Sequence, residues 1–175
     1  MDESDTERTS DRDRERKPEA EPNALATVRA YYETLREGEP LEPFFDKDSK
    51  AVKFGITERL TGYEAIAESL RTQTETTTDW TIESHALVVG ERADHAWFAD
   101  EVSMAWSDTT TGERHDYQTR WSGTLEWRAG DDDHDRDRGP RSDAENHDGT
   151  GGDVSSEEEQ AGWRFVSMHV SRSES

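Results

Sequence analysis

Long runs of alternating apolar and polar side chains constrain this chain more than any other feature of its sequence. They cover residues 79–90, 95–106 and 115–127, and a fourth run returns at 163–170. A period of two is typical of strands that bury one face. Short turns separate the first three runs, and the fourth can pair with the third as a hairpin. The sequence therefore predicts an antiparallel meander of four strands.

Two segments with a helical period precede most of these strands. The first spans 23–38, where apolar residues recur every three or four positions, with Asn23 placed to cap its start and Gly38 to end it. The second follows Gly62, and a short strand is expected between them at 51–55. Helices followed by a strongly curved sheet predict an α+β domain in which the helices cover one sheet face.

Two charged segments set the expected domain boundaries. Residues 1–22 and 130–161 hold almost no large apolar side chains and are expected to be disordered. The domain is then expected at 23–172, with 130–161 as an acidic insertion at a hairpin tip and 173–175 as a tail, because a long loop adds little closure entropy. The run DDDHDRDR at 131–138 lacks the glycine of a calcium loop and is interpreted as a solvated spacer. The sequence predicts no metal site and no cofactor.

The charge balance narrows the expected partners and location. The formal net charge is −21, which disfavours nucleic acid because phosphates would be repelled. Lysine is scarce while arginine and threonine are common, a balance that resembles proteins of salt-loving archaea; an acidic protein of an ordinary cytoplasm is the alternative. Cysteine is absent, which excludes disulfides and thiolate metal sites. No apolar stretch near the N-terminus could serve as a signal or membrane span, so a cytoplasmic protein without membrane contact is expected.

Five segments, in this order, resemble the SnoaL-like members of the nuclear transport factor 2-like superfamily. They are VRAYYETLREGE (28–39), VKFGITERLTGYEAI (52–66), HAWFADE (95–101), YQTRWSGTLEW (117–127) and GWRFVSMHVS (162–171). The resemblance implies a conical α+β barrel, in which a mixed or antiparallel sheet curls around a pocket closed by the N-terminal helices. It also implies a homodimer through the outer sheet face. It does not imply one reaction, because members include isomerases, cyclases, dehydratases and association domains.

Ketosteroid isomerase has the best-understood chemistry on this scaffold, with an Asp base and with Tyr and protonated Asp donors to the oxyanion. By the resemblance, Tyr31 falls where the oxyanion-binding tyrosine stands. The position of the base falls near Phe54, and that of the second acid near Gly123, and neither residue transfers a proton. A pocket-lining role is therefore favoured for Tyr31 over a catalytic one.

Aromatic residues are the expected contacts of a flat, apolar or polyketide-like ligand. The candidates are Phe54, Trp80, Trp97 and Trp121. Arg120 is a further candidate, because its guanidinium could bind a ligand carboxylate in fork geometry. A salt bridge from Arg120 to Glu101 or Asp100 across the sheet is the commoner explanation.

His169 is the candidate general base, because an imidazole that faces a cavity can accept a proton near neutral pH. Strict alternation places it on the same face as Trp163 and Phe165. Asp100 or Glu101 could orient it, although these two point to opposite faces of one strand. A half-buried histidine bonded to a carbonyl is the alternative, and it is slightly favoured.

The sequence thus predicts a pocket that binds a small, largely apolar molecule. Cofactor-free isomerase, cyclase or hydratase chemistry would use His169, Asp100 and Tyr31. A non-catalytic, dimeric association or ligand-sensing domain is the main alternative, and a purely structural homodimer is a third.

Overall fold

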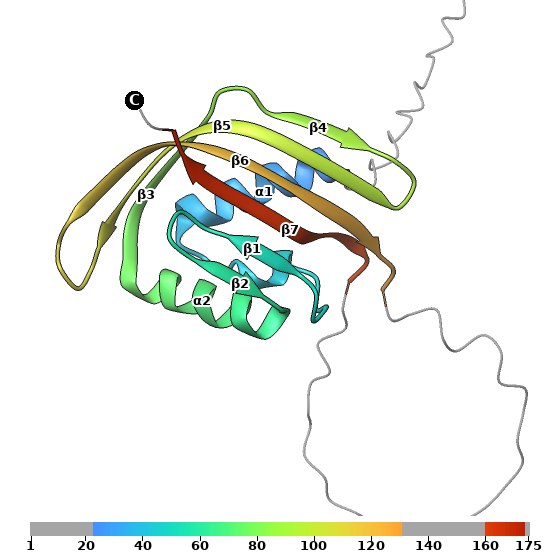
Figure 1. Cartoon of the computed structure of the whole chain (residues 1–175), viewed down its shortest axis with the longest axis horizontal. Coiled ribbons are helices and arrows are strands. Elements are labelled where there is room, and N and C mark those ends of the chain that lie inside the picture. Colours follow the sequence, from blue (N-terminus) through green and yellow to red (C-terminus); the bar gives the residue numbers. More distant parts are fainter. Residues whose placement is uncertain (1–22, 131–159, 174–175) are drawn as a thin grey trace, which may run out of the picture.

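The computed structural model describes residues 23–130 and 160–173, and it forms one seven-stranded sheet that arches over two helices (Figure 1). The elements are α1 (Ala24–Glu37), the 3-10 helix η1 (Glu42–Phe44), β1 (Val52–Phe54), β2 (Arg59–Thr61), α2 (Tyr63–Thr76), β3 (Thr77–Ser84), β4 (Val88–Glu91), β5 (His95–Asp108), β6 (Arg114–Arg128) and β7 (Gly162–Arg172). The tail predicted at 1–22 and most of the insertion predicted at 130–161 lie outside the described residues.

The strand order is β2-β1-β7-β6-β5-β3, with β4 beside one end of β5. All pairs are antiparallel except β1 with β7, so the sheet is mixed. Residues 119–128 of β6 pair with residues 162–172 of β7, which confirms the predicted terminal hairpin. Both helices lie on the concave side of the sheet (Figure 1), and the predicted α+β fold is confirmed.

Helix α1 begins and ends where its sequence predicts. The Asn23 side chain accepts a hydrogen bond from the backbone N–H of Ala26 at 2.8 Å, which satisfies one of the free donors at the helix start. Gly38 ends the helix in the left-handed region, with φ 71°. The helix face turned to the sheet is buried and consists of Val28, Tyr31, Tyr32 and Leu35.

The run at 79–90 forms two strands, which corrects the expectation of one. Ser84 of β3 pairs with Val102 of β5, and Val88 of β4 pairs with Ala99 of β5. The chain thus advances four residues from Ser84 to Val88 while β5 advances only three, from Val102 to Ala99. The extra residue inverts the alternation, because side chains follow the pleat of the partner strand. Val88, which was expected beside Trp80 on one face, is 63% exposed.

A β-bulge interrupts β7 in the same way. Leu125 of β6 pairs with Phe165, whereas the adjacent Thr124 pairs with Ser167, so Val166 is the extra residue. Trp163 and Phe165 are buried before the bulge, and Met168 and Val170 are buried after it. The inward-pointing residues of β7 are therefore odd-numbered before residue 166 and even-numbered after it.

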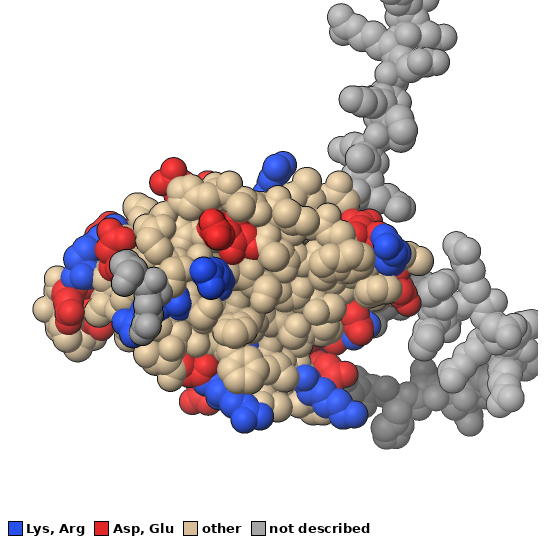
Figure 2. Space-filling model, turned by 45° about the horizontal axis from the view of Figure 1, so that its top comes forward, with Lys and Arg blue, Asp and Glu red and all other residues tan. Residues whose placement is uncertain are grey.

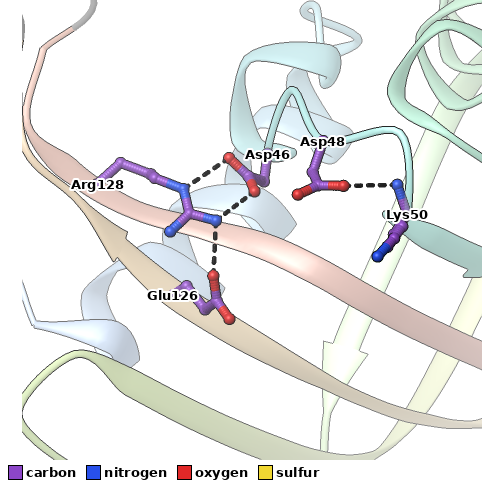
Figure 3. Close-up of polar contacts among 5 residues, drawn as sticks. All are labelled: Asp46, Asp48, Lys50, Glu126 and Arg128. Atoms are coloured by element: carbon purple, nitrogen blue, oxygen red, sulfur yellow. Dashed lines mark hydrogen bonds and ion pairs between the residues drawn. The ribbon is translucent and has the colours of Figure 1, made fainter.

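An arginine fork ties the end of β6 to the loop after η1 (Figure 3). Arg128 donates from Nε to Asp46 Oδ1 at 2.8 Å and from Nη2 to Asp46 Oδ2, and Nη2 also donates to Glu126 Oε2 at 2.6 Å. Asp46 is buried. A bidentate, charge-assisted pair of this kind fixes both partners. It holds the last residues of β6 in place three positions before the segment 131–159.

Candidate functional site

A cavity of about 320 Å³ lies between the concave face of the sheet and the helices. Its inner end is apolar and consists of Leu35, Met104, Trp121, Met168 and Val170, all of them buried. Its mouth is marked by the exposed lining residues Thr57 and Thr72, from the β1–β2 turn and α2. The volume falls at the lower end of the range for small-molecule sites.

Three side chains form a polar cluster in the cavity wall. Lys53 of β1 donates from Nζ to Glu58 Oε1 at 2.8 Å, and Ser69 of α2 donates from Oγ to Glu58 Oε2 at 2.9 Å. Lys53 is only 6% exposed, and a lysine so deeply buried requires such a partner. Burial alone would raise the pKa of Glu58, but the Lys53 ammonium and the hydrogen bonds from Lys53 and Ser69 outweigh it and lower that pKa. Glu58 is therefore an ionised acceptor.

Tyr31 of α1 brings a hydroxyl group to the same cavity. Its buried ring packs edge-to-face against Phe44, Phe165 and Trp121, with centroids 5.4, 5.3 and 6.2 Å away. Within residues 23–130 and 160–173, no hydrogen bond involves this hydroxyl. Burial, followed by the Glu58 carboxylate, raises the pKa of Tyr31 well above its ordinary value. Tyr31 is thus a neutral hydroxyl that is available to a ligand.

Together these groups can hold one polar atom of an otherwise apolar ligand. A lysine ammonium has three donors, and in the described part of the chain Lys53 uses one of them, toward Glu58. The remaining donors and the Tyr31 hydroxyl suit a carbonyl or hydroxyl oxygen, and Glu58 suits a hydroxyl hydrogen. Because Lys53 and Glu58 neutralise each other, the site favours an uncharged polar group over an ion.

Of the residues predicted from the sequence, the structure places Tyr31, Trp80 and Trp121 in the wall of the cavity. Contact of these residues with a ligand stays a prediction. Gly123, where the resemblance puts a second acid, has no room for a side chain, because a Cβ there would lie 2.4 Å from the Ser167 carbonyl oxygen.

Asp100 is buried on the inner face of β5, at 4% exposure, while Glu101 is exposed on the outer face. Only one of the two points inward, as their positions in the strand predict. Asp100 Oδ2 accepts from the Tyr32 hydroxyl at 3.1 Å, and Oδ1 accepts from the Ala86 N–H at 3.0 Å. Both oxygens are thus engaged by α1 and by the β3–β4 connection, and Asp100 does not line the cavity.

The remaining candidates lie on the convex outer face of the sheet. They are Phe54, Trp97, Arg120 and His169, and all are exposed. The expectation that His169 faces the pocket was wrong, because the bulge at Val166 inverts the face of β7. His169 is therefore separated by the sheet from Tyr31 and Asp100. Arg120 lies opposite Glu101 in the β5–β6 pairing, but in the described chain no ion pair joins them.

Sequence reasoning missed Lys53, Glu58 and Ser69. Their spacing of five and eleven residues follows no local motif, since they come from a strand, a turn and a helix. One signal was available: Lys53 stands in the apolar strand AVKFG, in a chain with few lysines. A lysine between two outward-facing apolar neighbours points into the fold.

Two further kinds of site were sought in the described residues. None of the helices there is long and apolar enough to cross a membrane. No group of three or more His, Asp or Glu side chains in residues 23–130 and 160–173 is arranged to hold a metal ion.

Comparison with known proteins adds a family and several structural neighbours. The model of a family described as a SnoaL-like domain matches residues 24–131. A nuclear transport factor 2-like superfamily protein from Salmonella enterica is similar at 14% identity and a TM-score of 0.58, over 85% of this chain and 87% of that one. A nuclear transport factor 2-like protein from Streptomyces avermitilis, named as a dehydratase, is similar at 12% identity and a TM-score of 0.58. The match covers 85% of this chain and 92% of that one.

A Thiobacillus denitrificans structure is named as a calcium/calmodulin-dependent protein kinase II association domain. It is similar at 14% identity and a TM-score of 0.53, over 87% of this chain and 97% of that one. At such identities these likenesses establish the fold alone. No curated protein matches the chain.

Proposed function

The chain belongs to the SnoaL-like domain family, and we propose that its cavity binds a small, mostly apolar organic molecule whose one polar group contacts Lys53, Glu58 and Tyr31. The observation that carries this proposal is that Lys53, Glu58 and Tyr31 line one cavity of about 320 Å³ together with buried apolar side chains. Ligand sites combine apolar walls with a few placed polar groups in this way.

Acid–base chemistry on the bound molecule is the finer form of this proposal. Tyr31 would donate to a ligand carbonyl, and Glu58 would accept a proton from the neighbouring carbon. Structural neighbours named as dehydratases support chemistry of this class. The lowered pKa of Glu58 makes it a weak base while Lys53 is bound to it, so turnover requires that the ligand separate the two. Binding is therefore the function that the geometry supports best.

A thermal-shift titration with small aromatic alcohols and ketones tests the proposal. We expect 2-naphthol to raise the melting temperature of the protein, and Glu58→Gln to weaken that shift. Glu101→Gln is the matched control, because Glu101 is exposed on the outer face, and it should leave the shift unchanged. Equal shifts in both variants, or none in the unmodified protein, would reject the proposed site.

Self-association through the outer face is a second candidate function, and a distinct observation favours it. From β4 to β1, two rows of register partners on the outer face contain no Asp, Glu, Lys or Arg, although 36% of the chain is charged; the first row ends beside Arg59 of β2. The rows are Val88, Ala99, Ser122, His169 and Phe54, and Gly90, Trp97, Thr124, Ser167 and Val52. Figure 2 shows a broad uncharged area over the sheet.

Adjacent rows of uncharged side chains that include an exposed indole, here Trp97, are typical of an interface. We expect a homodimer in sedimentation equilibrium, and we expect Ala99→Arg to convert it to monomer, because the change puts two charges into a two-fold contact. Ala93→Arg is the control, since Ala93 is exposed in the β4–β5 turn. A monomeric parent protein, or a dimer that survives Ala99→Arg, would contradict this second candidate.

A further inference from the structure

Two stacked indoles form part of the cavity wall. Trp80 of β3 and Trp106 of β5 are half-buried, their ring centroids are 4.8 Å apart, and their planes differ by 18°. Both line the cavity, as do the exposed residues Thr57 and Thr72. The indole pair is therefore a partly exposed portion of the cavity wall.

Two hydrogen bonds fix the Trp80 ring in addition to the stack. Its Nε1–H donates to Thr77 Oγ1 at 2.8 Å, and Thr77 Oγ1 donates to the carbonyl oxygen of Gln73 at 2.5 Å. Gln73 belongs to α2, which continues into β3 without a loop. The indole is thus anchored to α2, and residues of α2 also line the cavity.

The backbone beside Trp80 is strained. The pairing of β3 with β5 shifts between Thr78 and Thr81, and within this bulge Asp79 has φ 55°. It is the one residue other than glycine with positive φ in residues 23–130 and 160–173. Side chains disfavour this left-handed region, and such strain is kept where the surrounding structure imposes it. Arg114 of β6 supplies a brace, because its Nη1 donates to the Asp79 carbonyl oxygen at 2.7 Å.

We propose that the strained bulge at Asp79, braced by Arg114, holds the Trp80 indole across the cavity mouth, and that Trp80 thereby limits the ring size of planar ligands that the cavity admits. This inference rests on the proposed ligand-binding function. Bulges next to binding sites commonly re-aim a side chain, and here the bulge places the indole parallel to Trp106. Trp80 is the specificity-determining residue, and Asp79 and Arg114 are positioning residues.

Phenol, 2-naphthol and 1-hydroxypyrene test the size limit, because they share one hydroxyl and differ in ring number. Binding is followed by quenching of tryptophan fluorescence. We expect the parent protein to disfavour 1-hydroxypyrene, and we expect Trp80→Ala to reduce its preference for 2-naphthol over 1-hydroxypyrene by about tenfold. Trp97→Ala removes an indole from the outer face and should leave the preference unchanged. An unchanged preference in Trp80→Ala would overturn the inference.

Circular dichroism tests the positioning separately, because stacked indoles give an exciton couplet. Arg114→Met should weaken both the couplet and the size preference, and Arg114→Lys should restore part of each. Asp79→Gly should keep the couplet, since glycine adopts positive φ freely. Arg164→Met is the control, because Arg164 donates to a backbone carbonyl elsewhere, that of Trp163. A full couplet in Arg114→Met would refute the brace, whereas failure of all three probes to bind any variant would refute the proposed function instead.

Discussion

Tyr31 and Tyr32 are adjacent in α1 but hold their hydroxyl groups in different surroundings, so replacing each with phenylalanine separates ligand binding from stability. The Tyr31 hydroxyl belongs to the cavity wall, without a hydrogen bond in the described chain. The Tyr32 hydroxyl lies away from that cavity and donates to the buried Asp100 carboxylate at 3.1 Å. Both substitutions remove one oxygen and keep the ring, so each serves as the control for the other.

The structure gives a magnitude for each substitution. Tyr32→Phe leaves a buried carboxylate oxygen without its hydroxyl donor, and we expect the free energy of unfolding to fall by about 2 kcal/mol. For a domain of this size, that loss lowers the melting temperature by about 8 °C. Tyr31→Phe breaks no internal hydrogen bond, so the free energy of unfolding should change by less than about 0.5 kcal/mol. It should weaken 2-naphthol binding about fivefold, because a neutral hydrogen bond contributes about 1 kcal/mol.

Urea denaturation and calorimetric titration measure the two effects on the same samples. The reasoning predicts a crossed pattern, in which Tyr32→Phe loses stability and keeps affinity, while Tyr31→Phe keeps stability and loses affinity. A loss of stability in Tyr31→Phe that matches that of Tyr32→Phe would show an internal partner for the Tyr31 hydroxyl. Unchanged affinity in Tyr31→Phe would remove this hydroxyl from the binding site.

Alkaline pH gives a further readout for the same pair. Burial raises the pKa of both tyrosines above the ordinary value of 10.0, and the Asp100 carboxylate adds to the effect on Tyr32. Below pH 10 the two tyrosines are protonated in both the folded and the unfolded protein, so they do not make stability depend on pH. Above pH 10 the unfolded protein loses these protons while the folded protein keeps them, so the free energy of unfolding falls as the pH rises. Each phenylalanine variant should make this fall shallower by about 1.4 kcal/mol per pH unit. Equal slopes in the variants and the parent would contradict the buried placement.

Two other substitutions and one segment replacement test the packing of the fold. Gly123→Ala should destabilise the fold by about 2 kcal/mol in urea denaturation, because the new Cβ would meet the Ser167 carbonyl oxygen; an unaffected protein would show that the β6–β7 pair is looser than described. Arg128→Met should lower the free energy of unfolding by about 2 kcal/mol, because it leaves the buried Asp46 carboxylate without its guanidinium partner. A loss no larger than that from breaking an exposed ion pair would contradict the role of the arginine fork. Replacing 131–159 with a short turn should keep or slightly raise the melting temperature, because Arg128 and Gly162 are already paired; a collapse would show that the segment is structural.

The strands could be predicted from the sequence because alternation, caps and turns are local signals. Helix α1 lies between Asn23 and Gly38 as expected, and residues 119–128 pair with the terminal strand. The direction in which individual side chains face was less predictable. A single bulge residue, Val166, moves His169 from the expected inner face to the outer one, and no residue type marks that position.

The polar cluster could not be predicted, for a related reason. Lys53, Glu58 and Ser69 meet because the loop after β1 brings Glu58 between β1 and α2, and no local sequence motif encodes that arrangement. The aromatic wall was easier to anticipate, since tryptophans in alternating strands are usually buried, and Trp80 and Trp121 line the cavity. Trp97 was the exception, because its position in β5 places it on the outer face over Gly90.

Methionine methyl groups offer the most direct test of ligand binding inside the cavity. The chain contains three methionines, of which Met104 and Met168 line the cavity and Met1 lies outside the described residues. In a titration of methyl-labelled protein with 2-naphthol, followed by NMR, we predict saturable shifts of the Met104 and Met168 signals and none of Met1. An absence of shifts up to the solubility limit, or equal shifts of all three signals, would contradict a binding site beneath the sheet.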